Sequence, residues 1–382
     1  MDVIDQIFVL ATRWILEFAG RFLPPLLVVL LSILISITAI ALFAPLTMMY
    51  LTWLERKIVG RIQNRYGPNR VGKYGLLQPI ADGIKMLTKE DIVPHGADRT
   101  VHFLAPIAVV VPSLLLFAVL PFGRGMIAAD LDVGLLFFIA ISSLGTLAIF
   151  MGGWGSRNKF SLLGAMRAIA QMVSYEVPLV LSVVTAIMIS GSLSTRAIVE
   201  AQQGWWYFFT PWGLVGFVIF FISAVSEVNR TPFDIPEGES EIVAGFHTEY
   251  SGMKFALFYM AEFLNAFAFS ALGATLFLGG WLGSLLPSWA WFGLKTFVLI
   301  FIMIWFRGTF PRLRVDQLMG YAWKFLLPMS LVNILAAGLW HYLPTWAAWP
   351  ATMALLAAAF IALSNAHPTG EPLVKRTYPL VD

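Results

Sequence analysis

Residues 22–54 read FLPPLLVVLLSILISITAIALFAPLTMMYLTWL and contain no charged side chain, because the nearest charges are Arg21 before them and Glu55 after them. A helix needs about 20 apolar residues to cross the hydrocarbon core of a bilayer. The stretch exceeds this length, so it predicts one long transmembrane helix that is tilted in the bilayer.

The composition of the whole chain agrees with a membrane protein. Of 382 residues, 59% are hydrophobic and 12% are charged, whereas soluble domains carry roughly 25% charged residues. The formal net charge of +3 is too small to favour binding to nucleic acid by long-range electrostatics. Charges are costly inside a bilayer, so the few that are present are the first candidates for function.

Further apolar stretches predict an all-α, polytopic membrane protein. After the first helix, we expect spans at about residues 103–122, 133–153, 173–193, 212–228, 255–279, 289–306, 325–343 and 346–363. This gives nine transmembrane helices, with eight as the alternative, because no charge separates the last two. We expect one transmembrane domain over residues 1–382, with a C-terminal extension at 344–382 that holds the last helix and a cytoplasmic tail.

Two shorter segments are amphipathic at helical spacing. Residues 1–21 place apolar side chains opposite Asp5, Arg13 and Glu17, which predicts an interfacial helix rather than a signal peptide. Residues 76–89, in the first loop, have a similar pattern. Most of the 25 Lys and Arg residues fall in the loops after the odd-numbered helices and in the tail. The positive-inside rule therefore predicts that these loops are cytoplasmic and that the N-terminus is outside.

Cofactor ligands are scarce in the sequence. The chain has no Cys and five His, and no two of the His residues are four apart, as a haem-binding pair on one helix would be. Iron–sulfur clusters and most structural zinc sites need Cys thiolates, and no glycine-rich nucleotide-binding motif is present. We therefore expect no metal site and no cofactor bound by this chain alone. Any electrons would travel in other subunits.

The loop after the fifth predicted helix is acidic, although its side of the membrane is otherwise basic. Residues 227–254 contain six acids and two bases, and residues 237–241 read EGESE. Repulsion between such close carboxylates raises the pKa of some of them above the usual value of about 4.3 when they are partly desolvated. These carboxylates could accept protons as a group. The alternative is a solvated acidic turn.

Three carboxylates lie in or next to predicted spans. Glu262 is inside the sixth span, Glu176 is near the start of the fourth, and Glu227 ends the fifth. Ionisable groups at such depth face a bundle interior or water, and commonly relay protons. The alternative is a protonated Glu that only bonds a neighbouring helix. The basic segment that begins at Glu55 and Arg56 likewise has a simpler reading as a membrane anchor.

Four blocks together carry a family resemblance. They are ERKIVGRIQNRYGPNRVGKYGLLQPIADGIKMLTKE (55–90), SRNKFSLLGAMRAIAQMVSYE (156–176), EVNRTPFDIPEGESEIVAGFHTEYSGMKFALFYMAEF (227–263) and PRLRVDQLMGYAWKFLLP (311–328). In order and spacing they resemble the H-subunit family of bacterial complex I, the proton-pumping NADH–quinone oxidoreductase, and its mitochondrial counterpart, subunit 1. The resemblance covers residues 22 to about 343.

The resemblance implies a role in a respiratory electron-transport complex of the bacterial cytoplasmic (inner) membrane. In that family this subunit forms the membrane side of the quinone chamber, below a peripheral arm that carries flavin and iron–sulfur clusters. The implied partners are the quinone-site and terminal iron–sulfur subunits of that arm, the small and antiporter-like membrane subunits, lipid, and ubiquinone or menaquinone as substrate. The isolated chain is expected to have no activity, and no residue of it is expected to transfer electrons.

The resemblance also implies site residues. Those matching the quinone chamber and its entrance are Glu55, Arg56, Arg61, Arg65, Phe233, Asp234, Arg307, Arg312, Arg314 and Asp316. Those matching a proton relay are Glu176, Glu227, Glu237, Glu239, Glu241, Glu249 and Glu262. The implied mechanism is electrostatic: quinone reduction changes the charge in the chamber, and the carboxylates pass the change on.

Two other functions remain open from the residues. Membrane-bound hydrogenases and ferredoxin-linked complexes contain an equivalent subunit, but the glycine- and arginine-rich first loop favours the quinone enzyme. A stand-alone proton or solute transporter is disfavoured, because the chain has no internal repeat.

Overall fold

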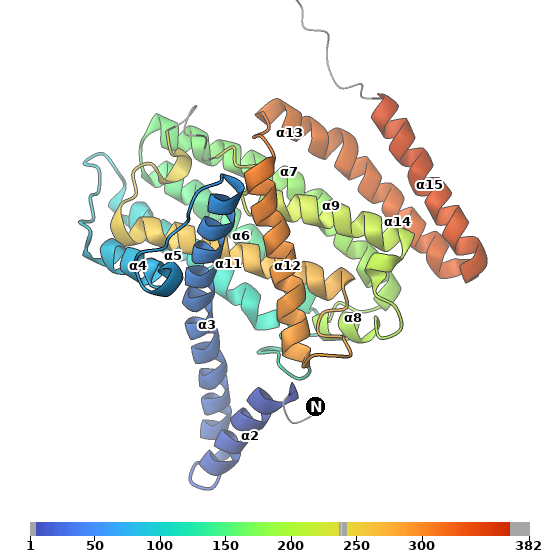
Figure 1. Ribbon diagram of the computed structural model, residues 1–382, viewed down its shortest axis with the longest axis horizontal. Coiled ribbons are helices and arrows are strands. Elements are labelled where there is room, and N and C mark those ends of the chain that lie inside the picture. Colours follow the sequence, from blue (N-terminus) through green and yellow to red (C-terminus); the bar gives the residue numbers. More distant parts are fainter. Residues whose placement is uncertain (1–4, 237, 239–242, 367–382) are drawn as a thin grey trace, which may run out of the picture.

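The computed structural model describes residues 5–236, 238 and 243–366. Among these residues every regular element is helical (Figure 1). Eight helices are long and apolar enough to cross a membrane. They are α3 (Pro25–Ile62), α5 (Arg99–Leu115) with η2 (Leu116–Val119), α6 (Gly134–Gly155), α7 (Lys159–Ser190), α11 (Gly252–Phe277), α12 (Ser288–Thr309), α13 (Val315–Tyr321) with η5 (Ala322–Leu326) and α14 (Leu327–Tyr342), and α15 (Thr345–Ala366).

A ninth apolar helix is shorter. Helix α9 (Pro211–Glu227) has 17 residues. Within the described ranges, each of the nine sequence-predicted spans therefore corresponds to an apolar helix, and eight of these reach full spanning length. The all-α, multi-pass architecture expected from the sequence is confirmed.

Short helices connect the spans. They are α2 (Ile7–Ala19), η1 (Lys73–Gly75), α4 (Gln78–Thr88), α8 (Thr195–Glu200), η3 (Tyr207–Phe209) and η4 (Gly245–His247). Helix α4 coincides with the amphipathic segment expected in the first loop. Its Asp82 accepts a 2.6 Å hydrogen bond from Arg56 near the end of α3, so the two helices are tied together.

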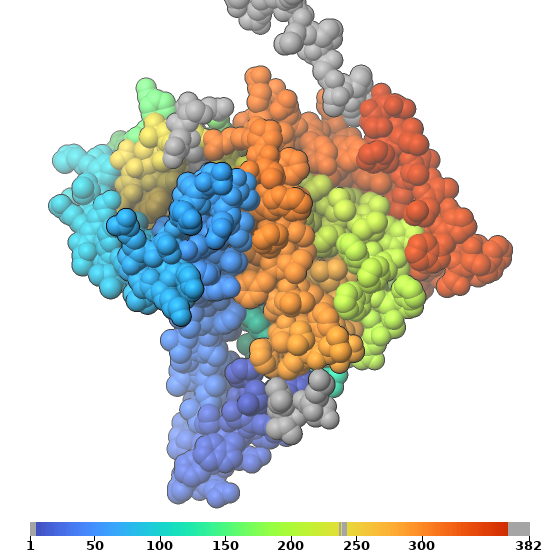
Figure 2. Space-filling view, viewed as in Figure 1, coloured from blue at the N-terminus to red at the C-terminus, as the bar shows by residue number. Residues whose placement is uncertain are grey.

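Helix α3 is unusual because its first half stands apart from the other helices (Figures 1 and 2). None of the residues in its most apolar 18-residue window is buried, and its first buried residue is Ala44. An apolar helix surface of this kind is stable only in contact with lipid or with another protein.

Small residues allow the remaining helices to pack closely around α11. A Cβ atom added to Gly153 of α6 would lie 2.3 Å from the Cβ of Ala165 in α7. A Cβ added to Gly164 of α7 would lie 2.6 Å from the Cα of Gly245 in η4. Close approach at small residues is the usual way in which helices associate in membranes.

Several helices extend beyond the spans expected from the sequence, because they continue into charged residues. Helix α3 ends at Ile62, so it contains Glu55, Arg56 and Arg61, and helix α12 contains Arg307 in its last turn. Helix α7 begins at Lys159, which places Glu176 well inside it rather than near its start. These side chains are compatible with a helix because most of them lie at the surface or have polar partners.

Candidate functional site

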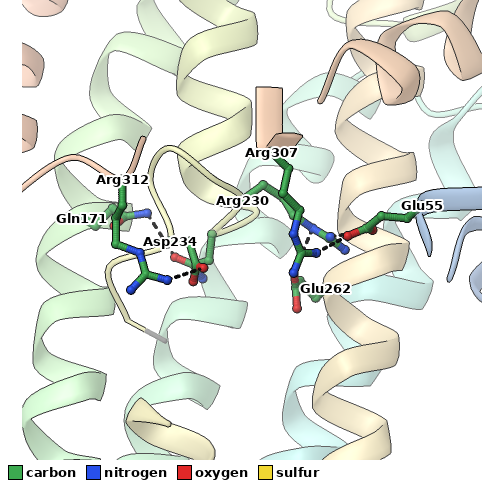
Figure 3. Close-up of polar contacts among 8 residues, drawn as sticks. Glu55, Gln171, Arg230, Asp234, Glu262, Arg307 and Arg312 are labelled. Carbon is green, nitrogen blue, oxygen red and sulfur yellow. Dashed lines mark hydrogen bonds and ion pairs between the residues drawn. The ribbon is translucent and has the colours of Figure 1, made fainter. Parts of the chain in front are cut away.

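Arg230 is the centre of a buried ion-pair network (Figure 3). It lies in the loop after α9 and is 6% exposed. Its Nη1 atom is 2.7 Å from Oε2 of Glu55 in α3, and its Nε atom is 2.8 Å from Oε1 of Glu262 in α11. The guanidinium carbon also lies 4.3 Å from the ring centre of Phe263. One arginine therefore joins two carboxylates from different helices.

Arg307 adds a second positive charge to the network. It comes from the last turn of α12, and its Nη1 atom pairs with Oε1 of Glu55. The network of Glu55, Arg230, Glu262 and Arg307 has equal numbers of positive and negative groups. Burying charges is tolerable only when they are paired in this way.

The network lies at one end of a pocket between α3, α11 and α12. The pocket has a volume of about 20 Å³. Its lining residues are Leu51, Glu55, Arg230, Phe263, Ala266, Ile300, Met303, Ile304 and Arg307. Three of these are charged and six are apolar, so the pocket has a polar end and hydrocarbon walls.

A second ion pair lies beside this network. Asp234 accepts a 2.9 Å hydrogen bond from Arg312, in the loop after α12 (Figure 3). Burial raises the pKa of Asp234 above its ordinary value, although the charge and hydrogen bond of Arg312 oppose this shift. The neighbouring Phe233 is buried and packs against Tyr175 of α7, with ring centres 5.3 Å apart.

Glu227 and Glu176 form a separate carboxylate group. Glu227 ends α9 and is 5% exposed. Glu176 accepts a hydrogen bond from Ser143 of α6. Gln171 of α7 fixes the loop that follows Glu227, because its amide donates a 2.8 Å hydrogen bond to the backbone oxygen of Ser226.

A cavity connects this group to the ion-pair network. It has a volume of about 40 Å³. It is lined by Val109, Gly145, Ile149, Met172, Glu227, Val228, Asn229, Phe246, His247, Phe255, Phe258, Tyr259, Glu262 and Asn265. Glu227 and Glu262 therefore face one enclosed space.

Other sequence-predicted residues lie outside the network. Glu249 accepts a 2.5 Å hydrogen bond from Asn158. Arg314 pairs with Asp316 at 3.5 Å, both at the surface, while Arg56 pairs with Asp82 and Arg65 bonds Gln63 at 2.6 Å. Arg61 is exposed. Glu237, Glu239 and Glu241 lie outside the described residues.

The sequence analysis did not identify Arg230, His247 or Asn265 as functional candidates. Arg230 was counted only as a loop charge. The available signal was its position three residues after Glu227, as one of two bases in an acidic stretch. His247 and Asn265 had no signal beyond their proximity in sequence to Glu249 and Glu262. Among the described residues, no three His, Asp or Glu side chains are grouped as a metal ion would require.

These features define a class: a multi-pass helical membrane protein with a charged network buried at the end of its bundle. A family model described as NADH dehydrogenase matches residues 35–338. The chain belongs to this family, as an H subunit of the multi-subunit NADH–quinone oxidoreductase.

Curated relatives carry the same family name. The chain is 53% identical over 292 residues to the H subunit of NADH-quinone oxidoreductase from Dehalococcoides mccartyi strain CBDB1, covering 76% of this chain and 82% of the relative. It is 53% identical over 300 residues to the H 2 protein of the same name from Syntrophobacter fumaroxidans, covering 76% and 90%. It is 51% identical over 310 residues to the H 2 protein from Geobacter sulfurreducens, covering 78% and 94%.

Proposed function

We propose that this subunit forms the membrane wall of the quinone chamber and its entrance. A membrane quinone has a polar headgroup and an apolar isoprenoid tail. The pocket between α3, α11 and α12 has matching ends: Glu55, Arg230 and Arg307 at one end, and aliphatic and aromatic walls along the rest. This two-sided pocket is the observation that carries the proposal. Phe233, Asp234, Arg312 and the more exposed Arg56, Arg61, Arg65, Arg314 and Asp316 would form the rim.

The same network would couple quinone reduction to proton movement. Arg230 divides its interaction between Glu55 and Glu262. A change in the charge of Glu55 or in its surroundings therefore changes how strongly Arg230 stabilises the ionised form of Glu262. Coulomb interactions between such close groups in a poorly solvated site are strong enough to shift a proton equilibrium. Glu227, Glu176 and Glu249 would continue the relay, together with Glu237, Glu239 and Glu241 of the acidic loop.

The proposal includes an orientation and partners. The charged ends of α3 and α12 would face the cytoplasm and the peripheral arm, whose subunits hold the flavin and the iron–sulfur clusters. The N-terminus, with α2 at the membrane surface, would be outside. Antiporter-like subunits would receive the proton signal. The printed names of the relatives favour a quinone enzyme over a hydrogenase, and we expect no transport by the isolated chain.

Glu262→Gln in the assembled complex tests the relay. The variant keeps the size of the side chain but cannot change charge. We expect quinone reduction coupled to proton pumping to fall at least fivefold, while NADH oxidation by a hydrophilic acceptor at the peripheral arm stays at the wild-type rate. Glu200→Gln is the matched control, because Glu200 forms an exposed pair with Arg196. Wild-type coupled activity in a fully assembled Glu262→Gln complex would refute the relay.

A further inference from the structure

The cavity between Glu227 and Glu262 is suited to hold water. A water molecule needs about 10–15 Å³ of a cavity measured in this way, so about 40 Å³ has room for about three. Its walls come from α5, α6, α7, α9 and α11 and from the loop around η4. The cavity therefore lies inside the bundle, between the two carboxylate groups.

Two buried oxygen atoms in its lining residues need hydrogen-bond donors. Among the described residues, Oε2 of Glu227 and Oδ1 of Asn265 have no hydrogen-bond partner. A buried polar atom without a partner is costly. Asn265 lies three residues after Glu262 in α11, so the two side chains point to the same side of the helix. Water in the cavity would reach both oxygens.

We propose that the cavity binds a short chain of water molecules between Glu262 and Glu227, and that Asn265 is the positioning residue of this chain. This inference rests on the proposed relay. A protonated Glu262 gives its proton to the first water, each water passes one proton to the next, and the last gives one to the ionised Glu227. One proton moves and no electron is transferred. The Asn265 amide carries no proton itself, but its oxygen holds and orients the middle of the chain.

The other ionisable groups that line the cavity are His247 and Tyr259. Burial lowers the pKa of His247 to about 4, so its imidazole is neutral near pH 7 and adds a hydrogen-bonding group without a charge. The remaining lining residues are apolar, apart from Asn229 and Gly145. They leave the two carboxylates as the ends of the chain.

Gly145 offers an independent way to remove the water. It lines the cavity from α6, and a Cβ atom added to it would have no neighbour within 4 Å. A valine there would extend into the cavity without meeting the backbone of another helix. Asn265→Leu would fill the same space from α11 and remove the amide.

The experiment measures protons pumped per electron, and the deuterium solvent isotope effect, in the assembled complex reconstituted into liposomes. We expect Asn265→Leu and Gly145→Val each to lower the ratio of protons to electrons at least threefold. Asn265→Ser, which retains a hydroxyl and leaves room for one more water, should restore at least half of the ratio. Gly293→Val is the matched control, because Gly293 of α12 also has open space around an added Cβ and does not line the cavity.

The outcomes separate this inference from the relay itself. Wild-type ratios in both cavity-filling variants would overturn the water chain, and would leave the relay intact if Glu262→Gln still lowers coupled activity. Equal losses in Asn265→Leu and Asn265→Ser, with an unchanged isotope effect, would show that Asn265 has only a structural role. Wild-type activity in Glu262→Gln would instead refute the relay.

Discussion

Arg230 lies 2.7 Å from Glu55, although 175 residues separate them in the chain. Glu55 belongs to the first long helix and Arg230 to the loop after α9, so their ion pair connects the two ends of the candidate site. The same guanidinium also contacts Glu262 of α11. The geometry of the site therefore depends on one arginine.

Replacing Arg230 should destabilise the subunit more than removing an exposed arginine. In Arg230→Met, Glu55 would keep its pair with Arg307, but Glu262 would lose its nearest positive charge. Removing one partner of a buried ion pair costs about 3–5 kcal/mol. We expect a lower thermal inactivation midpoint and less assembled complex on native gels.

The matched control for this prediction is Arg196→Met. Arg196 pairs with Asp130 and Glu200 at the surface, where such pairs contribute about 0–1 kcal/mol. Glu262→Gln combined with Arg230→Met should recover part of the lost stability, because the unpaired charge is then absent. Equal stability of the two arginine variants would contradict the central role of Arg230.

Lys295 should stabilise the end of the bundle opposite the site. Its Nζ atom donates hydrogen bonds of 2.7, 2.9 and 2.8 Å to the backbone oxygens of Leu278, Gly280 and Leu282, just after α11. It also lies 4.0 Å from the ring centre of Trp206. Hydrogen bonds to charged groups contribute about 1.5–3 kcal/mol each.

We therefore expect Lys295→Met to lower the thermal inactivation midpoint of the complex by several degrees. Turnover per assembled complex should stay near the wild-type value, because Lys295 is far along α12 from Arg307. Lys324→Met, at an exposed lysine, is the control and should have little effect. An unchanged midpoint for Lys295→Met would mean that water replaces the ammonium at these carbonyl groups.

His247 should make stability depend on pH. Burial lowers the pKa of His247 from the usual 6.5 to about 4. The unfolded chain therefore binds a proton below pH 6.5, while the folded chain does so only near pH 4. The stabilisation is complete above pH 6.5 and decreases as the pH falls toward 4, by about 1.4 kcal/mol per unit.

His247→Gln removes this titration. Between pH 7 and pH 5, the inactivation midpoint of the wild type should fall further than that of the variant. His341→Gln, at an exposed histidine of α14, should keep the wild-type slope. Parallel slopes for wild type and His247→Gln would show that His247 is not buried as a neutral group in the assembled complex.

Much of the fold could be predicted because membrane helices are coded locally. Length and lack of charge were enough to locate all nine apolar helices, and periodicity located α4. Their ends were less predictable, because Glu55 and Arg307 lie within helices and are compensated by partners elsewhere in the chain. A rule that ends a span at the first charge cannot account for such pairing.

The candidate carboxylates could also be predicted, because an acid in an apolar segment is conspicuous. Their grouping could not. Glu55 and Glu262 share Arg230, while Glu227 and Glu262 face one cavity with Asn265, and both relationships join residues from different helices. Hydropathy is a property of each segment and therefore determines which segments enter the membrane. Which charges neutralise one another, and where space is left for water, depends on how the helices pack, so only the tertiary structure decides it.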